Sequence, residues 1–150
     1  MDAAKLILLI GVSATSAMSA EQPKRCGVDR TGGVLTAHPI DVSPNRNGDR
    51  QIVADIDGDG VSDKISWFDP GSGSINPADN SRVTLTLSSS GKSFVLEEQR
   101  LQVVKYESKY FVVTRRVESE RGPFHTSIYA LTKAGITKVC SSSIGIRGVQ

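Results

Sequence analysis

Short runs that alternate between apolar and polar side chains recur along the chain, and they constrain the fold more than any other feature. In the run that starts at Arg82, Val83, Leu85 and Leu87 all fall on one face, which is the period of a half-buried strand. Turn-forming residues separate most of the runs, which cover residues 51–56, 64–68, 82–88, 94–98, 100–106, 110–117, 127–131 and 136–140. Short strands at this spacing predict an all-β, or mainly β, single domain built as an antiparallel meander or sandwich.

Helix signals are weak throughout. Residues 26–49 are interrupted by glycine and proline, and they predict turns with one short strand around Val34-Leu35. Residues 96–104 could form one or two helical turns, but the flanking β-branched and aromatic residues argue against a longer helix.

The first twenty residues have the composition of a signal peptide. Lys5 provides a positive charge, residues 6–12 are apolar, and small residues precede a cleavage point after Ser19 or Ala20. The apolar run is shorter than the roughly 20 residues that cross a bilayer, so a retained anchor is the less favoured alternative. We therefore expect a secreted or periplasmic protein with a signal peptide at 1–20, one β-rich domain at 21–140 and a flexible tail at 141–150.

Two cysteines lie near the ends of this domain. An even number of cysteines in an exported chain favours a disulfide between Cys26 and Cys140. Closing so long a loop would stabilise the fold by about 4–5 kcal/mol through loop-closure entropy. Two free thiols are the alternative.

An acidic loop lies between two of the predicted strands. Its aspartates occupy alternating positions, so several carboxylates can converge on one centre, and Gly60 permits the sharp bend that this requires. The predicted ligands are Asp55, Asp57, Asp59, the backbone carbonyl of Val61, and Asp63. Oxygen ligands without Cys or His favour a structural Ca²⁺ in this strand-loop-strand segment. The alternative is a hairpin turn built on Asp-Gly pairs, without a metal.

The loop resembles the calcium loops of FG-GAP and VCBS-type repeats, whose pattern is DxDxDGxxD between short strands. Asp55, Asp57, Asp59, Gly60 and Asp63 match that pattern over about a dozen residues. The resemblance implies calcium binding in an extracellular or surface protein. It does not extend to the β-propeller of that family, because a propeller needs several blades and the chain has one such loop.

No catalytic motif accompanies the loop. The only histidines are His38 and His125, and the chain lacks GxSxG, HExxH and phosphate-loop patterns. A net charge of +2 is too small to favour nucleic-acid binding. We therefore expect a non-enzymatic binding module whose partner is a protein or a cell-envelope glycan, with no membrane insertion of the mature form. The alternatives are a periplasmic inhibitor or immunity protein acting on a toxin or wall hydrolase, and a calcium-dependent hydrolase that pairs a loop aspartate with His125.

Overall fold

The structure is a computed structural model that describes residues 25–26, 28–70, 80–119 and 122–144. The described elements are α1 (Val28–Thr36), β1 (Arg50–Ala54), β2 (Asp63–Phe68), β3 (Ser81–Leu87), β4 (Lys92–Glu98), β5 (Arg100–Tyr106), β6 (Lys109–Val117), β7 (Phe124–Thr132) and β8 (Gly135–Ile144). The predicted signal peptide, residues 1–20, lies outside the described residues.

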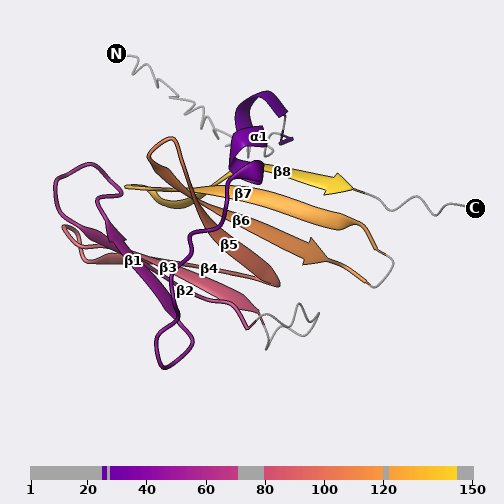
Figure 1. Cartoon of the computed structure of the whole chain (residues 1–150). Coiled ribbons are helices and arrows are strands. Elements are labelled where there is room, and N and C mark those ends of the chain that lie inside the picture. Colours follow the sequence, from indigo (N-terminus) through magenta and orange to yellow (C-terminus); the bar gives the residue numbers. More distant parts are fainter. Residues whose placement is uncertain (1–24, 27, 71–79, 120–121, 145–150) are drawn as a thin grey trace, which may run out of the picture.

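The strands form two antiparallel sheets that follow chain order. β1 to β4 make the first sheet and β5 to β8 the second, and within each sheet every strand pairs with the next strand along the chain (Figure 1). Each of the eight predicted runs lies largely within one of these strands. The all-β prediction is therefore confirmed, with one short helix added.

The main hydrophobic core lies between the two sheets. Ile65 and Leu85 enter it from the first sheet, and Val103 and Val112 enter it from the second. β3 is the clearest case, because its side chains alternate between buried and less buried positions along its whole length. Fully burying an aliphatic side chain stabilises a fold by about 1.5–3 kcal/mol, so this face-to-face packing is the main source of stability.

A second, smaller core lies on the outer face of the second sheet, where α1 covers it. Val34 of α1 is 3% exposed and belongs to the same cluster as Val113 and Ile128. The disulfide between Cys26 and Cys140 joins this cluster, with the two Cα atoms 5.0 Å apart. The predicted pairing of the cysteines is therefore confirmed.

The strand expected around Val34-Leu35 is wrong, because residues 28–36 form α1. Two consecutive glycines lower helix propensity, but tertiary packing outweighs it here. A Cβ at Gly33 would lie 2.3–2.6 Å from the ring of Tyr106, so the glycine lets the helix approach β5 closely. The Oγ1 hydroxyl of Thr36 also donates a hydrogen bond to the carbonyl of Gly32 at 3.0 Å.

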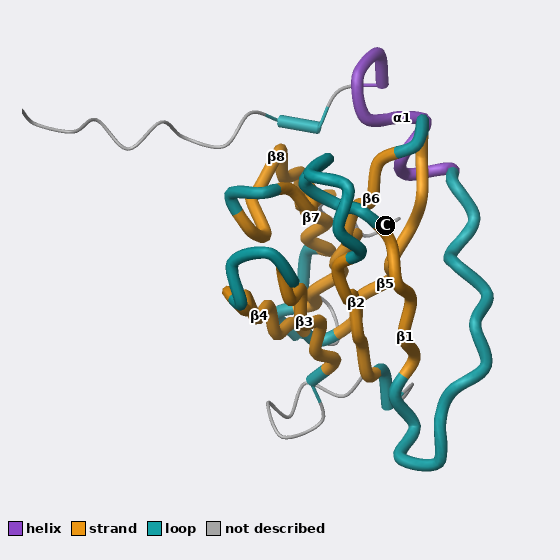
Figure 2. Tube along the Cα trace, turned by 90° about the vertical axis from the view of Figure 1, so that its left-hand side faces the viewer, coloured by secondary structure: helices purple, strands orange, loops and turns teal. Residues whose placement is uncertain are grey.

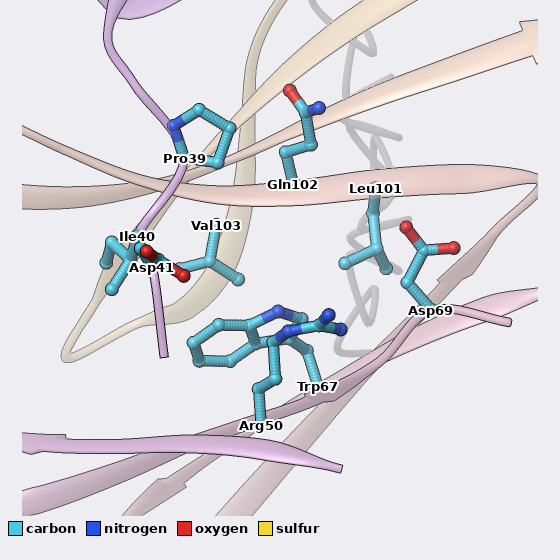
Figure 3. Close-up of a pocket in the computed structure, with 9 residues that line it drawn as sticks. All are labelled: Pro39, Ile40, Asp41, Arg50, Trp67, Asp69, Leu101, Gln102 and Val103. Carbon is cyan, nitrogen blue, oxygen red and sulfur yellow. The ribbon is translucent and has the colours of Figure 1, made fainter. Parts of the chain in front are cut away.

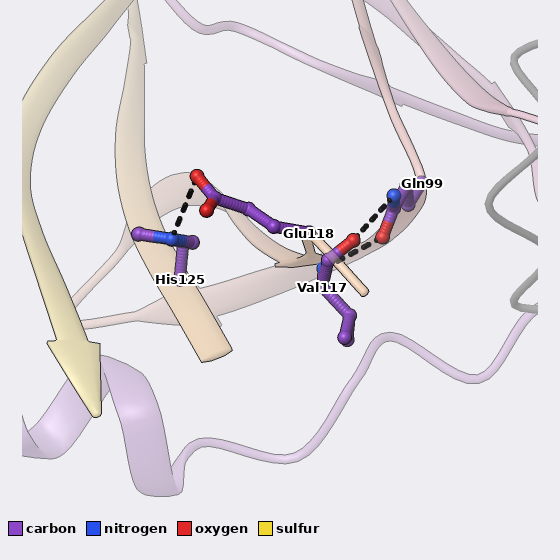
Figure 4. Close-up of polar contacts among 4 residues, drawn as sticks. All are labelled: Gln99, Val117, Glu118 and His125. Carbon is purple, nitrogen blue, oxygen red and sulfur yellow. Dashed lines mark hydrogen bonds and ion pairs between the residues drawn. The ribbon is translucent and has the colours of Figure 1, made fainter. Parts of the chain in front are cut away.

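The helical turns considered for residues 96–104 do not form. β4 ends at Glu98 and β5 begins at Arg100, so the single residue Gln99 carries the chain from one sheet to the other. The side-chain amide of Gln99 donates to the carbonyl of Val117 at 2.9 Å and accepts from its N–H at 2.7 Å (Figure 4). This side chain replaces a strand partner at the end of β6 and fixes the crossover.

Residues 141–144 were expected to belong to a flexible tail, but they are part of β8. β8 continues to Ile144, because Ser141, Ser142 and Ser143 pair with β7. The carbonyl of Ser141 also accepts the N–H of Cys26 at 3.3 Å. Residues 145–150 lie outside the described residues.

Residues 37–49 connect α1 to β1 and pass the free edge of β5 (Figure 2). The N–H of Ile40 donates to the carbonyl of Val103 at 2.9 Å, and Pro39 forms an isolated bridge with Val104. This segment therefore covers part of the edge of the second sheet. No helix in the described part of the chain combines the length and the apolar character that a membrane crossing requires.

Candidate metal centre

The acidic loop connects β1 to β2 at one end of the first sheet. β1 ends at Ala54, β2 begins at Asp63, and the two strands pair directly at these residues. Gly58 and Gly60 adopt φ angles of +77° and +83°, which residues with a side chain rarely take. The glycines therefore allow the eight intervening residues to fold into a tight loop.

Three carboxylates of the loop come together. One oxygen each of Asp55, Asp57 and Asp63 lies within 4.8 Å of the other two. Asp55 is exposed, Asp57 is half-buried and Asp63 is fully buried, so the group extends from solvent to the base of the loop. Among the described residues, this cluster could hold a metal ion.

Backbone N–H groups hold Asp55 in place. Its Oδ1 accepts hydrogen bonds from Gly58 at 2.8 Å and from Asp59 at 3.2 Å, and its Oδ2 accepts one from Gly60 at 3.0 Å. Each carboxylate oxygen carries two lone pairs, so Oδ2 keeps one for a further partner. The loop is thus shaped around the first aspartate by its own backbone.

Asp63 connects the loop to the body of the first sheet. Its side chain is 0% exposed, its Oδ2 accepts the N–H of Ile56 at 2.9 Å, and its Oδ1 accepts the N–H of Ser88 at 2.8 Å. The Oγ hydroxyl of Ser88 donates to the carbonyl of Ser62 at 2.6 Å. Ile56 packs against the main core, so Asp63 is anchored on both sides.

Asp59 lies in the same loop but outside this group of three. Its Oδ1 accepts the N–H of Val61 at 2.8 Å, and a hydrogen bond from the side chain of Ser89 lowers the pKa of its carboxyl. The N–H of Val61 is engaged in that contact, and its side chain is exposed. Of the five predicted ligands, the structure therefore brings together Asp55, Asp57 and Asp63, with Asp59 and Val61 beside them.

The electrostatics of the cluster oppose ionisation at Asp57. Burial of this carboxyl raises its pKa above the ordinary 3.8, and the negative charges of Asp59 and Asp63 raise it further. A hydrogen bond from the N–H of Asp59 acts in the opposite direction without cancelling the rise. A cation at this position would neutralise the repulsion.

The donor set fits a hard cation. The three carboxylates supply only oxygen, and no Cys or His belongs to the described group. Ca²⁺ takes 6–8 oxygen ligands, more than three carboxylates provide if each binds through one oxygen. Asp59, a backbone carbonyl and water are the sources of the remaining oxygens that this loop can offer.

Two functional contacts were not predicted from the sequence. Ser88 and Ser89 lie in the turn after β3, and they bond to Asp63 and Asp59, respectively. A run of small polar residues, 88–90, was the only local signal for this turn. It does not indicate a partner, because the bonded residues are distant in sequence.

His125 does not join the acidic loop. It lies at the start of β7, where its Nε2 is 3.2 Å from Oε1 of Glu118 (Figure 4). That distance fits an ion pair, but the contact lacks the direction of a hydrogen bond. His125 borders a cavity of about 220 Å³ together with Ser127 and Lys138, and no loop aspartate lines this cavity in the described part of the chain.

Fold and site together define a two-sheet β protein with a disulfide and a candidate cation centre in a strand-loop-strand hairpin. The chain matches no protein-family model, no curated protein and no solved structure.

Proposed function

We propose that this chain is an exported, non-enzymatic binding module that holds one Ca²⁺ in the loop from Asp55 to Asp63. The approach of three carboxylate oxygens to within 4.8 Å of one another is the observation that carries the proposal. Such an arrangement stores repulsion when empty and converts it into attraction when a divalent cation binds.

Calcium suits this loop better than other common cations. Soft or borderline metals prefer sulfur and nitrogen ligands, which the cluster does not offer. Mg²⁺ demands a compact octahedron at about 2.0–2.1 Å, whereas Ca²⁺ accepts irregular coordination and water. The resemblance to FG-GAP and VCBS-type loops points to the same ion.

The role of the cation is structural in this proposal. Asp63 is bonded both to Ile56 in the loop and to Ser88 in the next turn. A cation that also binds Asp55 and Asp57 would link these contacts into one unit at the end of the first sheet. The fold would then be stiffest where the β1–β2 hairpin meets the turn after β3.

Calorimetric titration with calcium tests the cation site. We expect binding in the range of about 10⁻⁴–10⁻³ M, as for extracellular modules, and weaker binding of magnesium. Asp57→Asn should abolish the heat of binding, and Glu97→Gln, an exposed carboxylate on β4, should leave it unchanged. Equal calcium binding by wild type and Asp57→Asn would contradict the proposed site.

Export is supported by the signal-like segment and by the disulfide, since disulfides persist mainly in oxidising compartments. Mass spectrometry of the protein secreted by an expressing cell would test it. We expect a mature chain that begins at Ala20 or Glu21, after cleavage behind Ser19 or Ala20. Retention of residues 1–20 would argue for an anchor instead.

A further inference from the structure

A groove follows the edge of β5, at the opposite end of the β1–β2 hairpin from the acidic loop. It consists of a cavity of about 340 Å³ and a smaller one of about 60 Å³, which share Asp69, Leu101 and Gln102 as walls. Arg50 and Trp67 lie in the larger cavity, and these residues are direct cross-strand partners at the end of β1 and β2 (Figure 3). A volume of this size falls in the range of small-molecule sites.

The walls of the groove come from three separate parts of the chain. Leu101 and Val103 of β5 point toward Trp67, which forms the apolar floor and is only 5% exposed (Figure 3). The segment containing Ile40 closes one side, because its N–H bonds to the carbonyl of Val103. A floor and walls fixed by core packing and backbone hydrogen bonds make a preformed site.

Arg50 supplies a positive charge inside this groove. Its side chain is half-buried, and within residues 25–26, 28–70, 80–119 and 122–144 it has no carboxylate or hydrogen-bond partner. Partial burial of a guanidinium without a partner costs free energy, which an incoming anion would offset. The planar fork of arginine suits a carboxylate in particular.

Two further arginines border the smaller cavity. Arg100 and Arg115 are directly opposite on neighbouring strands, and both side chains are exposed. Arg115 presents its guanidinium to this cavity and could take an anionic group of a ligand there. Positive charge therefore borders both cavities, with Arg50 at the larger one and this pair at the smaller one.

Two carboxylates also line the groove and narrow the class of ligand. Asp41 borders the larger cavity, and Asp69 borders both cavities while its Oδ1 accepts the hydroxyl of Ser81 at 3.0 Å. These groups would repel a ligand that is anionic along its whole length. They would accept hydrogen bonds from hydroxyls, and Gln102 adds an amide that can both donate and accept.

We propose that this groove binds an acidic oligosaccharide of the uronic-acid type. Its carboxylates would engage Arg50 and Arg115, and its hydroxyls would donate to Asp41 and Asp69. This inference rests on the proposal that the chain is a binding module and names the ligand class. It does not require the cation, because the five residues of β1 separate the groove from the acidic loop by about 17 Å.

The test is calorimetric titration with trigalacturonate, with its methyl ester as the uncharged control of the same shape. We expect binding of the acid and none of the ester. Arg50→Gln and Arg115→Gln should each weaken binding about tenfold or more, since each removes charge-assisted hydrogen bonds. Arg82→Gln, an exposed arginine on β3 outside the groove, should bind as wild type does. Thermal melts of all three variants establish that each is folded.

Several outcomes would overturn the inference. These are no binding of trigalacturonate, equal binding of the ester, wild-type affinity in both groove variants, or tighter binding of a hexaglutamate peptide. The variant Asp57→Asn separates this inference from the cation proposal. It should no longer bind calcium, but it should bind trigalacturonate with the same Kd as wild type. Calcium binding without trisaccharide binding would leave the cation proposal standing and remove only the groove.

Discussion

Oδ1 of Asp63 accepts the backbone N–H of Ser88 at 2.8 Å, across 25 residues of sequence. This hydrogen bond joins the base of the acidic loop to the turn after β3, and the carboxylate that makes it is fully buried. The other oxygen of Asp63 accepts the N–H of Ile56. One side chain therefore satisfies two backbone donors from different segments.

Asp63→Asn should lower the free energy of unfolding by about 2 kcal/mol in the presence of chelator, as measured by urea denaturation. An amide has one acceptor oxygen, so its NH₂ group would face one of the two buried N–H donors. The chelator separates this effect from any loss of cation binding. Glu97→Gln is the matched control, and an equal, small effect of both variants would contradict the role of Asp63.

Asp57→Asn should separate stability from cation binding. The raised pKa of Asp57 indicates that folding disfavours its ionised carboxylate. The neutral amide in the variant should therefore leave the cation-free protein at least as stable as wild type. The same change removes a ligand, so calcium should no longer raise the melting temperature. Thermal melts with calcium and with EGTA measure both effects. A calcium-dependent rise that persists in the variant would exclude Asp57 as a ligand.

The affinity of the loop for calcium should decrease as pH is lowered. The pKa of Asp57 is raised above 3.8, so protons compete with the cation as pH drops from neutral toward that raised value. Calorimetric Kd values for calcium should therefore increase as pH is lowered stepwise from neutral toward the raised pKa of Asp57. A Kd that stays constant down to the lowest pH at which the protein is folded would contradict proton competition at Asp57.

The two shifted aspartates should have opposite effects on the stability of the cation-free protein. Between 3.8 and the raised pKa of Asp57, the folded state binds more protons than the unfolded state, so Asp57 makes stability fall as pH rises. The pKa of Asp59 is lowered, so its stabilising contribution is present above 3.8 and is lost as pH falls through its folded pKa. Urea denaturation in chelator at several pH values, on wild type and Asp57→Asn, isolates the first effect.

Removal of the disulfide should cost about 4–5 kcal/mol of unfolding free energy, because the bridge joins residues separated by 114 positions. The double variant Cys26→Ala/Cys140→Ala should show this loss in denaturant titrations, and reduced wild type should match it. Unreduced native protein should not react with a thiol reagent. A reaction of two thiols per chain would contradict the bridge.

The turn between β5 and β6 offers a stabilising substitution. Glu107 and Ser108 form a two-residue connection with φ angles of +47° and +64°, a conformation that favours Asn-Gly. Replacing both residues by Asn-Gly should raise the free energy of unfolding by about 1 kcal/mol. Ser108→Ala, which keeps the unfavourable backbone conformation, should bring no gain. Equal stability of the Asn-Gly variant and Ser108→Ala would contradict the prediction, because it would show that the positive φ angles of this turn do not cost stability.

Sequence periodicity predicted strands such as β3 well because they bury one face. The run of Val83, Leu85 and Leu87 is buried in the core as the alternation indicated. α1 was missed because its stability depends on distant partners. Val34 packs against strands far along the chain, and Gly33 is needed only because Tyr106 lies next to it.

The candidate cation site was predictable as a set of aspartates, because alternating positions in a tight loop can converge locally. The sequence did not predict which of them meet: Asp59 turns toward Ser89, and Asp63 is bonded to Ser88. The groove could not be predicted at all. Arg50, Asp69 and Gln102 come together only when the two sheets pack and residues 37–49 cover the edge of β5.

The disulfide has a mechanical consequence. A pulling force applied to the chain on the outer sides of Cys26 and Cys140 passes through the covalent bridge between Cα atoms 5.0 Å apart. The strands between these residues would carry none of that tension. In its oxidised form the protein should therefore resist stretching by its flanking segments, whereas reduction would expose both sheets to the load.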